Sequence, residues 1–337
     1  MMNYQAPGMV AYIATEGEGE LYITRGVGNL VTTEPISKNN YFRIASITKT
    51  FTAEAVLLLV DKGLIDLDKS ISFYLPELNI QNVSIEDKVS GNKIYGDKIT
   101  VRMLGNMTSG LFNYSADSDL TALYTSLGEK IFTPEELVAM STKHPLNFVP
   151  GTQYEYCNTN FIVLGLLIKK VTGQAVGDVM SERIFQPLGM ANTFWPNTRF
   201  LPYPYTHGYT SITGFLLDVT NWSPSWGEAA GILISNMSDL KIWIKEIYAR
   251  NLLSAKSKDE RFKWVDQYPT TNPGKLFYGF GLEKWGDWIG HPGIISGYNS
   301  QIFYNPLIKT TIIVTTNSDD GRPAENALVK FIEILDP

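Results

Sequence analysis

Residues 42–49 read Phe-Arg-Ile-Ala-Ser-Ile-Thr-Lys, and the apolar run Ala-Val-Leu-Leu-Leu-Val follows at residues 55–60. In a helix that begins here, residues three apart lie on one face, about 5–6 Å apart, so the Ser46 hydroxyl and the Lys49 amine can meet. Serine needs a base beside it to act as a nucleophile, and lysine is such a base only when its surroundings lower its pKa. The apolar run predicts a central helix shielded from water, which provides those surroundings.

The spacing alone is a weak signal, because Ser-x-x-Lys occurs again at Ser90/Lys93 and at Ser238/Lys241. The first of these lies in residues 86–98, a polar stretch that we expect to form an exposed excursion. The second lies on an expected surface helix, and we interpret both as chance matches. Even at residues 46 and 49, the alternative is a helix cap followed by a solvated lysine, which is a common use of these residue types.

Strand patterns occupy both ends of the chain, and helical patterns occupy the middle. Alternating and β-branched runs predict strands at residues 9–13, 21–24, 277–282, 298–304 and 310–315. A last helix is expected at about residues 324–335. This order predicts an α/β (α+β) fold, in which a discontinuous α/β lobe of about residues 1–60 and 275–337 carries an inserted helical lobe of about residues 61–274.

Helices of the middle section have recognisable ends. Thr133-Pro-Glu-Glu136 is a capping box with proline in the first turn, and it opens a helix that runs through Met140. The apolar run 158–171 predicts a helix that ends at Gly173. A further helix is expected at about residues 238–248.

Composition limits the classes of function and partner. Of 337 residues, 44% are apolar and 18% are charged, which predicts a large core, while the net charge of -6 argues against a nucleic-acid surface. One cysteine rules out an internal disulfide, and three histidines far apart in the sequence do not suggest zinc, so we expect no metal and no cofactor. No apolar run is long enough to span a membrane.

Two readings of location stay open. No signal peptide is visible, since the early apolar stretch 9–14 is short and the first basic residue is Arg25. As it stands the chain is expected to be soluble and cytoplasmic, or extracytoplasmic if it is a processed mature form. The oligomeric state is left open.

Two further stretches connect the Ser46 segment to a known family. They are Tyr154-Glu-Tyr156-Cys-Asn158 and Gly290-His291-Pro-Gly293. With Ser46 and Lys49 they resemble the ordered motifs Ser-x-x-Lys, Tyr-x-Asn and Lys/His-x-Gly of the penicillin-recognising serine hydrolases. That family includes DD-carboxypeptidases, class C β-lactamases, D-amino-acid amidases and family VIII esterases.

The resemblance covers nearly the whole chain. It includes segments 42–53, 108–111, 184–190 and 278–282. It implies one β-lactamase/transpeptidase-like catalytic unit over residues 1–337, with an antiparallel sheet flanked by helices and an active site between two lobes. Relatives usually have a helix before the first strand, so either the lobe lacks that helix or the N-terminus lies upstream.

The same resemblance implies catalytic roles. Ser46 attacks a carbonyl, Lys49 and Tyr156 share general-base duty, and Tyr156 returns a proton to the leaving group. Which of the two takes the serine proton is left open. A Tyr156 phenolate would need nearby cations, and Lys49 and His291 are the candidates. Taken alone, Tyr156 would be interpreted as a core tyrosine and His291 as a structural histidine.

Other residues are implied in substrate binding. Asn158 is expected to hydrogen-bond the substrate amide or Lys49, although it would also serve as a helix cap. The backbone N–H groups of Ser46 and Ile294 are expected to form the oxyanion hole, where Gly293 permits close approach. Trp226, rather than Trp222, is the candidate for an aromatic side chain lining the cleft.

Departures from the family pattern bear on the substrate. DD-carboxypeptidases carry hydroxyl residues where this chain has Pro292 and Ile294, neither of which has a side-chain donor. Recognition of a terminal carboxylate is therefore not expected, and amides, esters or aminopeptidase substrates are favoured. Asp117 or Asp119 is then a candidate partner for a substrate ammonium group, against the alternative of an ordinary solvated loop acid.

The sequence thus predicts a serine hydrolase that forms an acyl-enzyme on amide, peptide or ester bonds, with a small-molecule or peptide substrate containing D-amino acids. One alternative is a family VIII-type carboxylesterase or weak β-lactamase. Another, from a different class, is a penicillin-binding sensor that is acylated without turnover.

Overall fold

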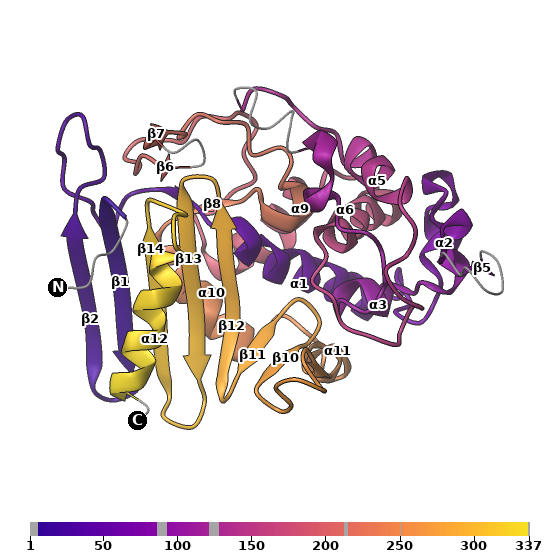
Figure 1. The fold of residues 1–337 in the computed structure, drawn as a ribbon. Helices are drawn as coiled ribbons and strands as arrows, with labels where there is room; N and C mark the ends of the chain where they lie inside the picture. The colour runs from indigo at the N-terminus through magenta and orange to yellow at the C-terminus, as the bar shows by residue number, and fades with distance from the viewer. Residues whose placement is uncertain (1–5, 86–92, 121–127, 212–214, 250, 336–337) are drawn as a thin grey trace.

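An eight-stranded antiparallel sheet forms one side of the molecule, and most of the helices lie beside it on the other (Figure 1). The computed structural model describes residues 6–85, 93–120, 128–211, 215–249 and 251–335. In spatial order, the strands are β2 (Gly19–Gly26), β1 (Gly8–Thr15), β14 (Thr310–Thr316), β13 (Tyr298–Asn305), β12 (Trp288–Ile295), β11 (Glu283–Trp285), β10 (Leu276–Tyr278) and β9 (Val265–Asp266).

The sheet joins the two ends of the chain. β1 pairs with β14 along its whole length, from Met9 opposite Thr316 to Thr15 opposite Thr310. Every residue of β14 is buried, because helices cover the middle of the sheet on both faces. α12 (Pro323–Leu335) crosses the front face in Figure 1, and α10 (Met237–Ala249) packs against the other.

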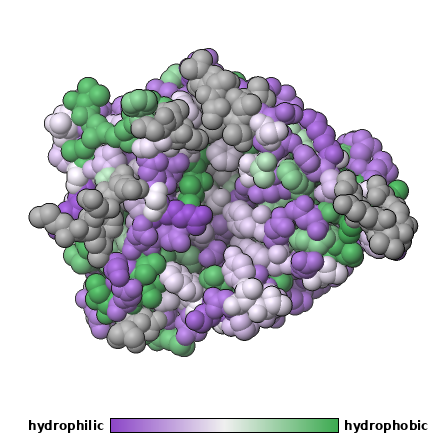
Figure 2. Space-filling model, in the orientation of Figure 1, coloured by the Kyte–Doolittle hydropathy of each residue, from purple (hydrophilic) through white to green (hydrophobic). Residues whose placement is uncertain are grey.

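The helices supply most of the remaining structure. Those not yet given are α1 (Thr48–Asp61), α2 (Ile71–Tyr74), α3 (Val101–Gly105), α5 (Pro134–Thr142), α6 (Asn158–Thr172), α7 (Val176–Met180), α8 (Gln186–Leu188), α9 (Glu228–Gly231) and α11 (Ala255–Arg261). None of the helices within the described ranges is long and apolar enough to cross a membrane. Figure 2 shows a hydrophobic patch at its upper left, in the region where Figure 1 labels β6 (Tyr209–Thr210) and β7 (Leu217–Asp218). Phe215 and Leu216, which precede β7 in the sequence, are exposed.

α1 is the central helix that the apolar run predicts. Its residues from Thr48 to Leu57 are all buried, and it packs against α6, α9 and α11. On its sheet side, Phe51 stacks on Trp243 of α10, with ring centroids 3.9 Å apart. Packing all round therefore keeps water away from the first turn, where Lys49 lies.

Most predicted elements are confirmed, with a few shifted ends. The capping box at Thr133 is present, and Gly173 ends α6 in the left-handed conformation. The strand expected over 277–282 stops at Tyr278, because Gly281 has a φ of +70° and the chain turns there into β11. Ser90 lies outside the described residues.

The two-lobe division stays a prediction. α10 falls inside the expected helical lobe by residue number, yet it packs on β13 and β14. The part of the molecule built on the sheet therefore includes α10 as well as the two ends of the chain.

Candidate active site

The nucleophile segment is a short 3₁₀ turn that leads straight into α1. The first residue of this turn, η1 (Ala45–Ile47), is Ala45, which has a φ of +50°. Residues other than glycine rarely adopt this conformation. Such backbone strain is characteristic of functional sites. The turn holds Ser46 at the rim of a cavity while its neighbours Ala45 and Ile47 stay buried.

Lys49 lies one turn further on, with its amine directly beside the serine. Nζ is 3.0 Å from Ser46 Oγ and donates a hydrogen bond to the Ala230 carbonyl at 2.7 Å. The side chain is fully buried, and this burial holds the pKa of Lys49 well below its usual value. A neutral amine has a lone pair and can accept the serine proton.

Tyr156 approaches from the segment before α6. Lys49 Nζ lies 5.0 Å from the centre of its ring. Burial raises the pKa of the Tyr156 phenol above its ordinary value, against the opposing effect of a hydrogen bond with Ser46. The phenol therefore keeps its proton in the resting site.

The expectation that cations stabilise a Tyr156 phenolate is wrong for the resting site. His291 is fully buried, and burial, followed by repulsion from Lys49 whenever that amine is protonated, lowers the pKa of His291 to about 3. Nδ1 lies 2.6 Å from the Pro292 carbonyl and must donate to it, so Nε2 accepts from the Tyr278 hydroxyl at 2.9 Å. His291 is thus a neutral imidazole with both nitrogens occupied, and neither of these bonds is to Ser46 or Tyr156.

The edge of β12 faces the nucleophile. A Cβ on Gly293 would lie 2.3 Å from the Ile44 carbonyl oxygen, so only glycine lets this strand approach the segment before Ser46. Ile295 and Tyr298 flank a two-residue turn, and the alternation of ladder hydrogen bonds then directs the Ile294 N–H away from β13. The pairing of β11 ends opposite Gly290, so no strand covers this part of the edge in the described structure. Ser46 and Ile294 line the same cavity, and the oxyanion hole expected from their N–H groups stays a prediction.

Asn158 and Trp226 lie beside Ser46. Both line a small cavity together with Tyr114, Gly227 and Gly231. The Asn158 amide nitrogen donates to Ser115 Oγ at 3.1 Å and not to Lys49, so the expected bond between Asn158 and Lys49 is absent from the described residues.

Asp117 is not where a substrate ammonium could reach it. The residue is only 5% exposed, and its carboxylate lies 2.8 Å from His144 Nε2 and also accepts the Asp119 N–H. It does not line either cavity beside Ser46, and Asp119 makes an ion pair with Lys143. The structure brings Ser46, Lys49, Tyr156, Asn158, Ile294 and Trp226 together and leaves Asp117 apart.

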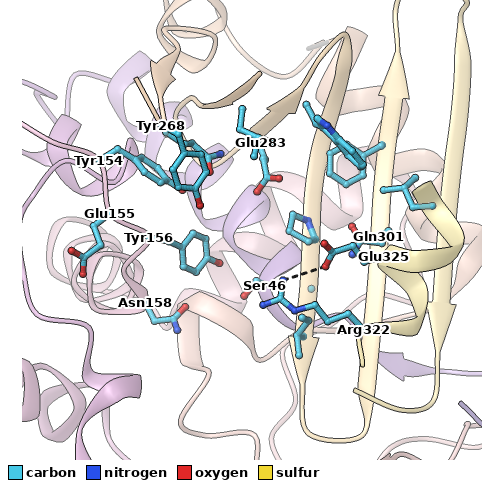
Figure 3. Close-up of a pocket in the computed structure, with 18 residues that line it drawn as sticks. Ser46, Tyr154, Glu155, Tyr156, Asn158, Tyr268, Glu283, Gln301, Arg322 and Glu325 are labelled. Atoms are coloured by element: carbon cyan, nitrogen blue, oxygen red, sulfur yellow. Dashed lines mark hydrogen bonds and ion pairs between the residues drawn. The ribbon is translucent and has the colours of Figure 1, made fainter. Parts of the chain in front are cut away.

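The main cavity, of about 760 Å³, runs from Ser46 past β10 and β11 to α12 (Figure 3). Sequence reasoning missed several of its polar side chains, namely Glu155, Gln267, Tyr268, Glu283, Gln301, Arg322 and Glu325. Two signals were available: Glu155 lies between Tyr154 and Tyr156 in the quoted motif, and Glu283 directly follows segment 278–282. These side chains come from elements far apart in the sequence, and only folding brings them to one cavity.

Known proteins are similar to this chain over most of its length. The penicillin-binding protein 4* of Bacillus subtilis is 28% identical over 342 residues, covering 95% of this chain and 70% of that protein. A D-aminopeptidase of Brucella anthropi is 30% identical over 332 residues, covering 95% of this chain and 58% of the enzyme. The chain spans about three fifths of the length of the D-aminopeptidases it matches.

Solved structures show the same fold. The D-stereospecific amidohydrolase from Streptomyces sp. superposes with a TM-score of 0.83 at 32% identity, covering 96% of this chain and 93% of that one. The D-amino acid amidase from Ochrobactrum anthropi SV3 gives a TM-score of 0.80 at 25% identity, covering 98% and 93%. The sequence model described as "Beta-lactamase" matches residues 1–333. The predicted resemblance and fold class are confirmed, and the chain belongs to the β-lactamase family.

Proposed function

We propose that this protein hydrolyses amide or peptide bonds of D-amino-acid-containing substrates through an acyl-enzyme on Ser46. The observation that carries the proposal is the buried Lys49 amine, 3.0 Å from Ser46 Oγ. Relatives named D-aminopeptidase, D-stereospecific amidohydrolase and D-amino acid amidase support the choice of bond and configuration.

Acylation begins with proton transfer from Ser46 to Lys49, whose low pKa leaves the amine free to accept it. Ser46 Oγ attacks the substrate carbonyl carbon, and the N–H groups of Ser46 and Ile294 stabilise the negative oxygen. Tyr156 gives its phenolic proton to the leaving nitrogen, and the proton held by Lys49 replaces it. The C–N bond breaks, the amine departs, and an ester remains on Ser46.

Deacylation reverses the proton path. Water attacks the ester carbonyl and gives a proton to the Lys49–Tyr156 pair, and the pair returns a proton to Ser46 Oγ as the carboxylic acid leaves. The proposed proton path uses only protein side chains and water, so activity should survive EDTA.

The substrate panel that tests this proposal is D-phenylalanine amide, L-phenylalanine amide, a p-nitrophenyl ester, a D-Ala-D-Ala peptide and a cephalosporin. We expect ammonia release from the D-amide in preference to the L-amide, and no release by the Ser46→Ala protein. Intact mass after mixing gives the acyl-enzyme directly. A stable cephalosporin adduct without turnover of any substrate would favour the penicillin-binding sensor, and ester turnover alone would favour an esterase.

Arg322 favours a second candidate, a DD-carboxypeptidase. It lines the main cavity, and a guanidinium can bind a terminal carboxylate through two hydrogen bonds. Against this, its Nη1 already donates to Glu325 at 3.3 Å, and Pro292 and Ile294 offer no side-chain donor.

Replacing Pro292 and Ile294 together by threonine separates the two candidates. For an amidase, the double variant should gain activity on the free-acid peptide relative to its amide by about 1–3 kcal/mol, the scale of new hydrogen bonds to a charged group. If the wild type already prefers the free acid by about tenfold, and Arg322→Gln abolishes that preference, the carboxypeptidase is correct.

A further inference from the structure

The main cavity is larger than catalysis at Ser46 requires. Its volume of about 760 Å³ lies within the range of ligand sites for drug-sized molecules. The wall beyond Tyr156 carries charged and polar groups: Glu283 of β11, Gln301 of β13, Glu325 of α12, and Arg322, which directly precedes α12. The proton path described above uses none of these side chains.

Glu283 is a carboxylate without a partner in this wall. It makes no hydrogen bond or ion pair within the described residues, and Figure 3 shows it directed into the cavity toward the side where Ser46 and Tyr156 lie. Burial, and then the negative charge of Glu325, raise the pKa of Glu283 to about 7, while Arg322 opposes the shift. A carboxylate in this state is stabilised by any cation that enters the cavity.

Gln301 supplies an independent indication of a ligand. The residue is 1% exposed, lines the same cavity, and its side-chain Nε2 has no hydrogen-bond partner. A buried amide donor without an acceptor is unfavourable, and a ligand carbonyl oxygen would satisfy it. Gln301 lies opposite Pro292 in the β12–β13 ladder, so both belong to the strand pair that borders Ser46.

The remaining lining suits a cation and not an anion. Tyr154, Tyr268 and Trp285 offer aromatic surfaces that attract an ammonium group. Among the described residues that line the cavity, Arg322 is the sole Lys or Arg, and it is paired with Glu325. An ammonium group thus meets an unpartnered carboxylate and aromatic rings, whereas a carboxylate would have to compete for Arg322.

We propose that Glu283 and Gln301 form a substrate-recognition subsite, in which Glu283 binds an ammonium group of the substrate and Gln301 Nε2 donates to a substrate carbonyl oxygen. This inference rests on the proposed function for the identity of the substrate. The ammonium can be the α-amino group of the acylated residue or a cationic side chain. Both have the same chemistry, and the experiment separates them.

Binding to the Ser46→Ala protein, measured by calorimetry, tests the subsite without turnover. The ligands are D-phenylalanine amide, N-acetyl-D-phenylalanine amide and N-acetyl-D-lysine amide, which carry an α-ammonium, no ammonium and a side-chain ammonium. We expect one charged ligand to bind about tenfold or more tighter than the neutral one. Adding Glu283→Gln should reduce that preference to within about threefold, and the ligand affected identifies the source of the ammonium.

Two further variants sharpen the result. Glu155→Gln makes the same change of charge at a cavity residue whose carboxylate is occupied by Asn147 Nδ2 at 2.6 Å, and it should alter the preference by less than about twofold. Gln301→Leu should weaken the charged and neutral ligands alike, because the carbonyl is common to both. Its thermal unfolding, compared with the parent, checks the fold.

An equal affinity for charged and neutral ligands, or a preference that survives Glu283→Gln, would overturn the subsite. Failure of the wild type to hydrolyse any amide would instead contradict the proposed function. The binding data would then still decide the role of Glu283.

Discussion

Two serine–lysine pairs with the same three-residue spacing lie in opposite surroundings. Ser46 and Lys49 lie where η1 enters α1, and Lys49 is fully buried with its amine 3.0 Å from the serine oxygen. Ser238 and Lys241 lie on α10, where Lys241 Nζ instead donates to Glu20 at 2.6 Å and to the Tyr22 hydroxyl at 2.9 Å. Ser238 is exposed, and its hydroxyl donates to Asn236.

The two amines differ in the charge that they carry. Burial without a carboxylate partner holds the pKa of Lys49 well below its usual value. Partial burial also acts to lower the pKa of Lys241, but its hydrogen bonds to Glu20 and Tyr22 outweigh that effect and raise the pKa. A nearby carboxylate therefore separates a structural lysine from one that can act as a base, and spacing does not.

The largest difference is expected when the serines are removed. Ser46→Ala should lower kcat/KM by at least about 10³-fold and abolish labelling by a serine-directed phosphonate, because loss of a nucleophile costs orders of magnitude. Ser238→Ala should stay within about twofold of the parent. Hydrolysis rates and intact mass measure both. Retention of more than about 1% activity in Ser46→Ala would exclude it as the nucleophile.

Removing the lysines should give the next largest contrast. Lys49→Met is expected to lower kcat by about 10²–10⁴-fold, the usual contribution of a positioned proton acceptor. Lys241→Met makes the same substitution at the other lysine, and its activity should stay within about twofold of the parent. Circular dichroism confirms that both proteins fold. Similar losses in both variants would mean that the Lys49 amine contributes no more to catalysis than the Lys241 amine.

Stability should depend on pH in opposite ways at the two lysines. The folded pKa of Lys49 is lowered, so between that pKa and about 10.4 only the unfolded chain binds the proton, and stability falls as pH falls. Lys49→Met removes a slope of up to about 1.4 kcal/mol per pH unit. Lys241 has a raised folded pKa, so its contribution is complete below about 10.4 and is lost as pH rises through that folded pKa.

Urea unfolding at several pH values from about 6 to 9 measures this contrast. Relative to wild type, Lys49→Met should become more stable as pH falls, while the difference for Lys241→Met should stay constant over the same range. A pH-independent difference for Lys49→Met would show that the folded protein keeps Lys49 charged.

The smallest expected effect is the loss of stability when the ion pair between Lys241 and Glu20 is removed. Lys241→Met should destabilise the protein by about 0.2–1 kcal/mol at low salt, because the Glu20 side chain is half exposed and such pairs contribute little. Raising the salt concentration should shrink the difference, since exposed charges are screened. Unfolding at low and high salt measures it, and a larger, salt-independent loss would point to packing of the lysine stem on Tyr12 and Tyr22 instead.

Local patterns allowed most elements to be predicted, because the forces that fix them act over a few residues. The capping box at Thr133 and the stop at Gly173 are local hydrogen-bond and backbone preferences. The apolar run after Ser46 requires burial on every side, so the dry setting of Lys49 also followed from the sequence. The order of the three motifs predicted roles for Ser46, Lys49 and Tyr156, and the structure places these residues close together.

Only the tertiary structure decided which site residues are charged and which side chains they contact. The sequence left Asp117 as a candidate partner for a substrate ammonium group, but in the structure His144 occupies its carboxylate. The sequence also left His291 as a candidate cation, but burial lowers the pKa of His291 to about 3. Glu283 and Gln301 share a wall only because β11 and β13 both flank β12. Protonation state depends on desolvation and on neighbours brought from distant parts of the chain, and neither is encoded within a short stretch of sequence.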